Sequence, residues 1–298
     1  MVGDATPLYR PARLSEAMDL RRKQNAIPFA GGTDLMVKHR RGAGALPSFD
    51  APLLFLDRCP ELRGLGPAPG GEGLLVGSMV TLAGLAESPL VPGALREAVL
   101  QMGGPALRSV ATLGGNVCNA SPAGDTLPFL YAWDARVTLA SSGGERSMPI
   151  SDFIVGPGRT AIRSDEILRS VLIPAWSPAL FSWRKVGTRR ANALTKVSLA
   201  AFVESDRGRP RRVRLALGAV GPTVVRLTAV EALLEEAGRD GSGLPALRPR
   251  AEQAVLNAVR PIDDQRSTAD YRRTVAVGLV LAFLEQALQT VPAAASGG

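Results

Sequence analysis

The chain has 298 residues, 46% of them hydrophobic, which is enough to bury a sizeable core and to divide into two or three domains. Two cysteines and one histidine are too few for a disulfide framework or a recognisable zinc or iron–sulfur site, and they favour a reducing compartment. The net charge of +8 is uneven, because the first 150 residues carry 14 basic and 13 acidic side chains and the rest carry 21 and 14.

Neither end of the sequence predicts a targeting or membrane segment. The N-terminus lacks the charged-then-apolar order of a signal peptide. The longest apolar run, residues 275–284, has ten residues and is too short to span a bilayer. We therefore expect a cytoplasmic protein.

The first third of the sequence predicts a small βαβ-like unit. Residues 8–26 predict a helix with Ser15 as its N-cap. The elements that follow are a strand and glycine turn at 27–33, a short helix at 34–41 and a buried strand at 53–57.

The glycine turn is the stretch with the clearest chemistry. Gly31 and Gly32 stop an apolar strand, and Thr33 and Asp34 follow as good first-turn helix residues. Glycine permits positive φ and close approach, and the N–H groups of a first turn point outward. Such a turn is a natural cradle for a phosphate or pyrophosphate, although many turns of this composition are only turns.

A second glycine pair follows about 80 residues later. Gly73–Ser78 predicts a strand, and residues 81–86 and 93–102 predict two packed helices. Residues 109–125 then form a loop of small and polar residues around Gly114 and Gly115, with few side chains that can build a core. Backbone N–H groups, hydroxyls and amides suit an extended polar ligand, so the two loops together predict a site for the two ends of a dinucleotide.

The remaining sequence predicts further strands and then helices. Residues 176–178 are typical of a domain boundary. Thr228 and Glu231 predict a capping box that opens a helix, and residues 238–249 predict a flexible loop. The other predicted elements are a helix at 126–133, strands at 135–140, 171–174, 181–186, 193–204 and 211–220, helices at 250–259 and from about 267, and a disordered tail at 292–298.

A basic stretch lies in the second half of the chain. Residues 184–214 hold ten Lys or Arg against Glu204 and Asp206, with strand-like apolar residues between them and no aromatic stacking partners. Solvated strand faces, an acidic partner subunit or a ligand diphosphate are the favoured explanations, and nucleic acid is the weaker alternative.

At the two glycine loops the sequence resembles the FAD-binding subunit of the molybdenum hydroxylases, the xanthine dehydrogenase and CO dehydrogenase group. That family carries an Ala-Gly-Gly-Thr-Asp-type loop and a Thr-x-Gly-Gly-Asn loop. Segments 153–160, 165–174 and 271–273 extend the resemblance over essentially the whole chain.

The resemblance implies an α+β fold in two parts. The first is a two-lobed FAD-binding domain of the vanillyl-alcohol oxidase and molybdenum hydroxylase flavoprotein type. The second is a C-terminal domain of antiparallel sheet plus helices. The implied bounds are 1–57 and 58–175 for the two lobes, 178–290 for the C-terminal domain and 291–298 for the tail.

The resemblance also implies which residues bind the cofactor, and it implies no catalytic residue and no metal site on this chain. By the resemblance, the first loop binds the pyrophosphate and the second loop contacts the flavin. Asp125 matches an acidic position that hydrogen-bonds the sugar-alcohol chain of the flavin. The alternative is that Asp125 is the N-cap of the next helix. Leu168 and Lys185 align near the isoalloxazine, where a cation stabilises the reduced ring, and Met102 departs from the aromatic residue of some relatives. The implied contacts are Phe29, Ala30, Gly31, Gly32, Thr33, Asp34, Leu35, Met102, Thr112, Gly114, Gly115, Asn116, Asp125, Leu168 and Lys185.

The function implied is that of an electron-transfer subunit with one non-covalent FAD. Its implied partners are a small subunit with two [2Fe–2S] clusters and a large subunit with a molybdenum cofactor, which form a heterotrimer. Electrons pass through iron–sulfur to FAD and leave to NAD⁺, oxygen or another acceptor. The form of the first loop favours a purine, N-heterocycle or aldehyde substrate over the CO dehydrogenase branch.

Two other classes of function remain as alternatives. One is a non-enzymatic basic adaptor that uses residues 184–214. The other is a self-sufficient flavin oxidase, disfavoured because nothing in the sequence supplies catalytic acid–base residues.

Several tempting residues have a simpler interpretation. Residues 156–161 fit the dinucleotide fingerprint G-x-G-x-x-G/A, but Pro157 lies inside the turn and no acidic residue follows about 20 positions on. Cys118 is interpreted as a small residue in a tight turn rather than a redox thiol, and His39 as a surface residue. The cations at 38, 40 and 41 are interpreted as a solvated helix face rather than phosphate ligands.

Overall fold

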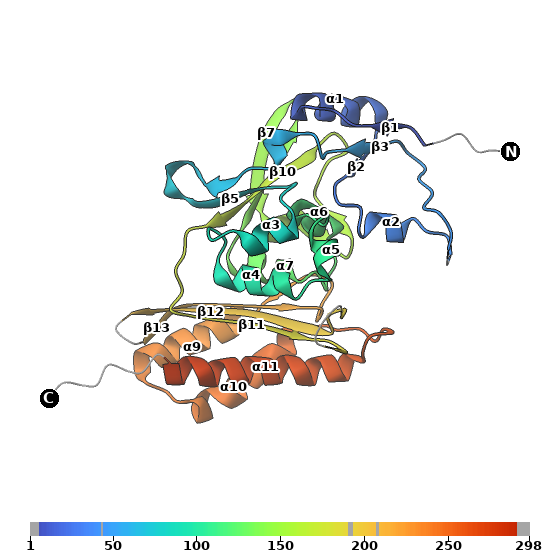
Figure 1. Cartoon of the computed structure of the whole chain (residues 1–298). Coiled ribbons are helices and arrows are strands. Elements are labelled where there is room, and N and C mark those ends of the chain that lie inside the picture. Colours follow the sequence, from blue (N-terminus) through green and yellow to red (C-terminus); the bar gives the residue numbers. More distant parts are fainter. Residues whose placement is uncertain (1–5, 43, 190–192, 207–208, 291–298) are drawn as a thin grey trace. The chain divides into compact units, whose positions relative to one another are not determined.

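A computed structural model describes residues 6–42, 44–189, 193–206 and 209–290 of the chain (Figure 1). The predicted tail at 292–298 lies outside the described residues. The chain forms two compact units, each assembled from segments that are not contiguous in sequence. The first unit comprises Met1–Val91, Gly103–Ala120 and Ala135–Ala175, and the second comprises Pro92–Met102, Ser121–Asp134 and Trp176–Gly298.

The first unit begins with a small parallel sheet that contains the predicted βαβ-like unit. Its strands are β1 (Leu8–Tyr9), β2 (Ile27–Phe29) and β3 (Leu53–Phe55), in the order β1-β3-β2 with both pairings parallel. Helix α1 (Leu14–Gln24) connects the first two strands, and α2 (Leu35–Lys38) follows β2. The core under this sheet is apolar and includes Leu54, Leu62 and Ala17, none of which is exposed. The βαβ prediction is confirmed.

The first unit also contains a five-stranded antiparallel sheet in the order β4-β5-β10-β6-β7. A second glycine segment follows α5 (Pro105–Arg108) and forms α6 (Leu113–Asn119), which packs against β10. The five strands are β4 (Leu65–Pro67), β5 (Gly73–Gly77), β6 (Arg136–Ser141), β7 (Gly144–Pro149) and β10 (Ile167–Pro174). The remaining elements of this unit are η1 (Pro60–Leu62), η2 (Pro69–Gly71), α3 (Leu82–Glu87), α8 (Ile150–Phe153), β8 (Ile154–Gly156) and β9 (Arg159–Thr160).

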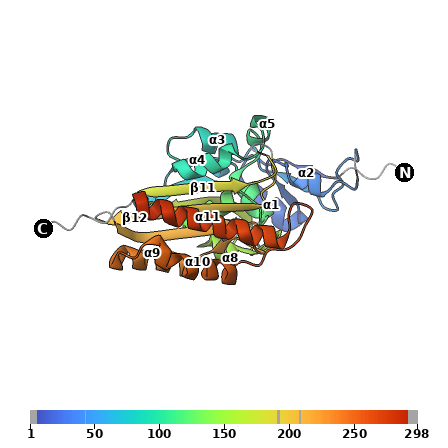
Figure 2. The ribbon, with the colours of Figure 1, turned by 90° about the horizontal axis from the view of Figure 1, so that it is seen from below.

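The second unit is a four-stranded antiparallel sheet, β11-β12-β13-β14, with helices on both faces (Figures 1 and 2). Val203 of β12 packs into the core under α9, α10 and α11, whereas Phe202 lies 5.7 Å from the ring of Phe129 on α7 at the other face. Because both faces are covered, most of β12 is buried. The bounds are β11 (Leu180–Val186), β12 (Val197–Asp206), β13 (Arg209–Gly218), β14 (Val225–Arg226), α4 (Gly93–Leu100), α7 (Thr126–Ala132), α9 (Thr228–Asp240), α10 (Leu244–Ala258) and α11 (Ala269–Thr290).

One predicted helix start and one predicted cap are wrong, although α9 does begin at Thr228 as expected. Leu8 pairs with Leu53 as a parallel edge strand, so the first helix begins only at Leu14 and Ser15 lies inside it. The predicted capping box also fails, because the Glu231 carboxylate accepts from the backbone N–H of Leu215 and from Arg226 instead. In both cases a contact distant in sequence overrides a local preference.

The flexible loop predicted at 238–249 is wrong as well. Helix α9 continues to Asp240, and Gly241 ends it with a φ of 78°. Helix α10 begins at Leu244 and includes Pro249. The α+β class and the C-terminal antiparallel sheet with helices are confirmed, whereas the domain bounds remain predictions.

Candidate functional site

The first glycine segment is a tight turn between β2 and α2. Gly32 has a φ of +69°, and a Cβ built there would lie 2.3 Å from the Phe29 ring. A side chain at position 32 would therefore be both strained and blocked. The predicted strand, turn and helix start are present, although α2 has only four residues.

The structure brings the two glycine segments into backbone contact within the first unit. A Cβ on Gly31 would lie 2.0 Å from the carbonyl oxygen of Val110 and 2.9 Å from the Cα of Ala111. A Cβ on Gly115 would lie 3.9 Å from that of Ala30. Glycine at position 31 therefore lets one backbone rest directly on the other.

The two segments differ in whether their backbone N–H groups have hydrogen-bond partners. None of the hydrogen bonds between described residues uses the backbone N–H groups of Gly31 to Leu35. Backbone donors seldom stay unpaired, so these five N–H groups face water or a ligand with acceptor oxygens.

The second segment was expected to offer N–H groups too, and this expectation is wrong for its first turn. The N–H groups of Leu113 and Gly114 donate to Val80 O and Ser78 O. Those of Gly115 and Asn116 donate to the Thr112 hydroxyl and carbonyl, because Thr112 caps α6. The segment is a short helix rather than a loop, and Gly114 serves close packing, since a Cβ there would lie 2.5 Å from that of Ser78.

A side-chain amide also joins the two segments. Asn119, the last residue of α6, donates from Nδ2 to the Asp34 carboxylate at 3.1 Å. Its Oδ1 accepts from the Lys38 ammonium. Lys38 is thus neither the free phosphate ligand nor the purely solvated cation that were weighed from sequence.

The second unit holds a buried polar cluster around Asp125. The Lys185 ammonium donates to Asp125 Oδ2 at 2.6 Å and to the Gln101 carbonyl at 3.1 Å, and the Thr195 hydroxyl donates to Asp125 Oδ1. The side chains of Asp125 and Lys185 are each 8% exposed. Burial raises the pKa of Asp125, while the Lys185 charge and the Thr195 hydroxyl act in the opposite direction.

Asp125 occupies the N-cap position of α7 but makes no side-chain cap bond. Its two oxygens are directed to Lys185 and Thr195 instead. The capping alternative weighed for this residue is therefore wrong for its side chain.

The predicted contacts thus fall into two groups, one in each unit. Residues 29–35, 112–116 and Leu168 belong to the first unit, and Met102, Asp125 and Lys185 to the second. Leu168 is buried in β10 beside an irregularity in the register, and Met102 follows α4 with its N–H on Val99 O.

The remaining candidate side chains have structural surroundings. Burial raises the pKa of the Cys118 thiol to about 12, so it is not a thiolate at neutral pH. The His39 ring stacks on Phe49 with 4.5 Å between centroids. Within the described part of the chain, no group of three His, Cys, Asp or Glu side chains is placed to hold a metal ion.

Basic residues of the 184–214 stretch are engaged inside the second unit. Arg214 Nε lies 3.4 Å from the Asp134 carboxylate. The Arg212 guanidinium lies 4.7 Å from the centroid of the Trp176 ring. These two arginines contact an acidic and an aromatic side chain of their own unit, which weakens the nucleic-acid interpretation.

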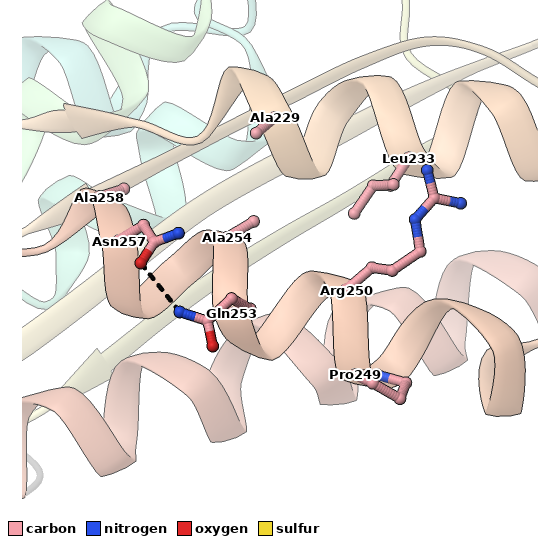
Figure 3. A pocket seen from close by; sticks show the side chains of 8 residues that line it. All are labelled: Ala229, Leu233, Pro249, Arg250, Gln253, Ala254, Asn257 and Ala258. Atoms are coloured by element: carbon pink, nitrogen blue, oxygen red, sulfur yellow. Dashed lines mark hydrogen bonds between the residues drawn. The ribbon is translucent and has the colours of Figure 1, made fainter.

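A groove on the second unit contains none of the predicted residues (Figure 3). It runs between α9 and α10, and Arg250 at its edge donates to Glu236 at 3.0 Å. Its lining is Ala229, Leu233, Pro249, Arg250, Gln253, Ala254, Asn257 and Ala258.

Sequence reasoning missed three partners of the predicted residues. Asn119 lies 85 residues from Asp34, and Thr195 lies 70 residues from Asp125. Gln101 contributes only its backbone carbonyl. Asn119 alone carried a signal, because it stands in the same small polar stretch as the second glycine pair.

Two family models match the chain in succession. The FAD binding domain in molybdopterin dehydrogenase matches residues 4–176, and the CO dehydrogenase flavoprotein C-terminal domain matches residues 182–287. The chain is 29% identical over 304 residues to the xanthine dehydrogenase FAD-binding subunit of Escherichia coli O157:H7, covering 99% of this chain and 98% of that protein. It is 26% identical over 243 residues to the carbon monoxide dehydrogenase medium chain of Hydrogenophaga pseudoflava, covering 79% and 81%.

Solved structures share the fold. Carbon monoxide dehydrogenase from Hydrogenophaga pseudoflava matches with a TM-score of 0.85 and 25% identity, covering 98% of this chain and 100% of the matched chain. Quinoline 2-oxidoreductase from Pseudomonas putida 86 matches with a TM-score of 0.83 and 25% identity, covering 98% and 99%. Among the described residues, no helix combines the length and apolarity needed to cross a bilayer.

Proposed function

Because this chain belongs to the family of FAD-binding domains in molybdopterin dehydrogenases, here followed by a CO dehydrogenase flavoprotein C-terminal domain, we propose that it is the electron-transfer subunit of a multi-subunit molybdenum hydroxylase. It is a flavoprotein subunit of the xanthine dehydrogenase and CO dehydrogenase type of oxidoreductase. The partners, the acceptor and the substrate belong to the proposal.

The observation that carries the proposal is the contact between the two glycine segments beside a run of open amides. Gly31 rests on the backbone of Val110, and the N–H groups of Gly31 to Leu35 have no partner among the described residues. Unpaired N–H groups on consecutive residues of a turn suit the oxygens of a pyrophosphate. The first segment therefore holds the diphosphate of FAD, with the Thr33 hydroxyl as a further donor.

The roles of the two segments differ in this proposal. The backbone N–H groups in the first turn of the second segment donate to acceptors within the protein. This segment therefore contributes to the cofactor site through its backbone surface and through the polar side chains of Thr112 and Asn116. Gly114 and Gly115 place no side chain on that surface. Phe29, Ala30 and Leu168 complete the contacts of this unit with the cofactor.

The cluster in the second unit keeps the capacity to bind a polar ligand. A lysine ammonium has three donors, and Lys185 uses two of them within the described part of the chain. The Asp125 carboxylate has about four acceptor positions, of which described residues occupy two. Asp125 therefore accepts from the sugar-alcohol chain, and Lys185 directs its third N–H to the isoalloxazine, with Met102 as an apolar neighbour of the ring.

When bound, FAD supplies the redox chemistry by taking up electrons and passing them on. This chain holds and orients it, and the Lys185 charge favours the reduced anionic ring. The donors are the [2Fe–2S] clusters of a partner subunit, and the acceptor is NAD⁺, oxygen or another oxidant.

The substrate of the complex is a purine, an N-heterocycle or an aldehyde, oxidised on a large molybdenum subunit. Relatives named xanthine dehydrogenase, nicotinate dehydrogenase and aldehyde oxidase support this range. A carbon monoxide dehydrogenase role is the second candidate, supported by the C-terminal family model and by the match to that enzyme's structure.

The test is the visible spectrum of the purified chain together with the flavin released on denaturation. The expected result is flavin bands and one FAD per chain. A colourless chain that takes up no added FAD and binds nucleic acid with a steep salt dependence would support the basic adaptor instead. Molybdenum and iron in a complex purified at native expression levels would test the partners separately.

A further inference from the structure

One exposed side-chain cluster links the two glycine segments. Asn119 ends α6, and its amide stands between the Asp34 carboxylate and the Lys38 ammonium. Asp34 is the N-cap residue of α2, and Lys38 is its last residue. One amide thereby connects both ends of α2 to the end of the second segment.

The chemistry of the cluster fixes the orientation of the amide. A carboxylate only accepts and an ammonium only donates, so the NH₂ of Asn119 faces Asp34 and its carbonyl oxygen faces Lys38. Each group forms a charge-assisted hydrogen bond, and the charges of Asp34 and Lys38 cancel. Glutamine carries the same amide, whereas aspartate has no hydrogen to donate to Asp34.

The cluster lies next to the open amides of the first segment. The five N–H groups end at Leu35, which directly follows Asp34. The hydrogen bond from Asn119 therefore holds the residue on which the turn from Gly31 into α2 ends. The backbone contact of Gly31 with Val110 fixes the other end of the same turn.

We propose that Asn119 is a positioning residue that sets the spacing of the two glycine segments and thereby the affinity for the cofactor diphosphate. The proposal rests on the function proposed above. Asn119 acts through Asp34 and Lys38, so its effect depends on the pattern of charges in the cluster and not on its own contact with the ligand.

The test compares a charged with a conservative substitution at Asn119. Asn119→Asp places a second carboxylate against Asp34, and we expect it to raise the Kd for FAD about fivefold or more at low salt. Asn119→Gln keeps an amide that can donate to Asp34 and accept from Lys38, and we expect a Kd within about twofold of wild type. Asn257→Asp is the matched control, because Asn257 also pairs through an exposed amide, with Gln253 of α10.

Two further readouts separate positioning from general damage. Screening by salt weakens exposed like-charge repulsion, so the ratio of the Kd of Asn119→Asp to that of the control shrinks between about 0.05 and 0.5 M salt. Hydrogen exchange of the α2 amides in FAD-free protein speeds up in Asn119→Asp and stays at the wild-type rate in Asn119→Gln.

Each outcome decides something different. If wild-type protein binds FAD and Asn119→Asp binds it equally well, the positioning role is wrong while the proposed function stands. If Asn119→Gln binds FAD as weakly as Asn119→Asp does, the pattern of charges in the cluster does not set the affinity and the inference is again overturned. If wild-type protein binds no FAD, the proposed function itself fails.

Discussion

Alanine at position 31 tests the contact on which the cofactor site depends. The new Cβ would lie 2.0 Å from the Val110 carbonyl oxygen, whereas such contacts are essentially never below 3.0 Å, so the two segments must separate by about 1 Å. Overpacking of this kind costs about 1–3 kcal/mol, and each kcal/mol lowers the Tm by about 2–4 °C in a unit of this size. If the separation removes even one charge-assisted hydrogen bond to the diphosphate, worth about 1.5–3 kcal/mol, the Kd for FAD rises about 10- to 150-fold.

The assay is FAD titration followed by flavin fluorescence, with thermal unfolding of the FAD-free protein alongside. Gly66→Ala is the matched control, because nothing lies within 4 Å of a Cβ built there and its φ is not in the left-handed region. We expect the control to bind FAD as wild type does. Equal affinities of the Gly31→Ala protein and the control would refute the contact as the basis of the site.

Three further perturbations have worked-out directions. Replacing Lys185 with methionine leaves the Asp125 carboxylate buried without its cation, which should destabilise the protein by about 3–5 kcal/mol. The loss should be largest at high pH, because burial already raises the pKa of Asp125 and removal of the cation raises it further. Thermal unfolding at pH 5 and pH 8 checks this. The Cys118 thiol, with its pKa raised to about 12, should resist iodoacetamide at pH 8 in the native protein and react in denaturant, as mass spectrometry of the labelled peptide would show. Arg146 donates to Glu166 and lowers the pKa of that carboxyl group. The pair therefore stabilises the fold above the ordinary carboxyl pKa, and this stabilisation is lost as pH falls through the lowered pKa. Glu166→Gln should cost about 1–3 kcal/mol at pH 7 and nearly nothing near pH 3, as denaturant unfolding at each pH would show.

The local chemistry of the first glycine turn could be predicted from sequence. Two glycines at the end of an apolar strand permit a positive φ, and Gly32 has one. The family resemblance added the functional assignment, which the two family models support. The second glycine segment was misjudged, because Thr112 is an N-cap and its hydroxyl takes up an amide that a loop would have left open.

Other elements show the same division. Alternation of apolar residues predicted the C-terminal strands, since the side chains of a strand point to opposite faces. The capping box at Thr228 failed because Glu231 pairs with Arg226, a choice made by the packing of α9 against the sheet.

The sequence by itself determined which residue types stand at the turns and strands, because those choices follow from backbone φ and from side-chain period. Only the tertiary structure decided which segments meet. Gly31 lies against Val110, Asn119 donates to Asp34, and Lys185 donates to Asp125. The two side-chain pairs are 85 and 60 residues apart in the sequence. The sequence around either partner does not indicate such a contact. The physical reason is that burial and hydrogen bonding reward a juxtaposition only after the whole unit has folded around it.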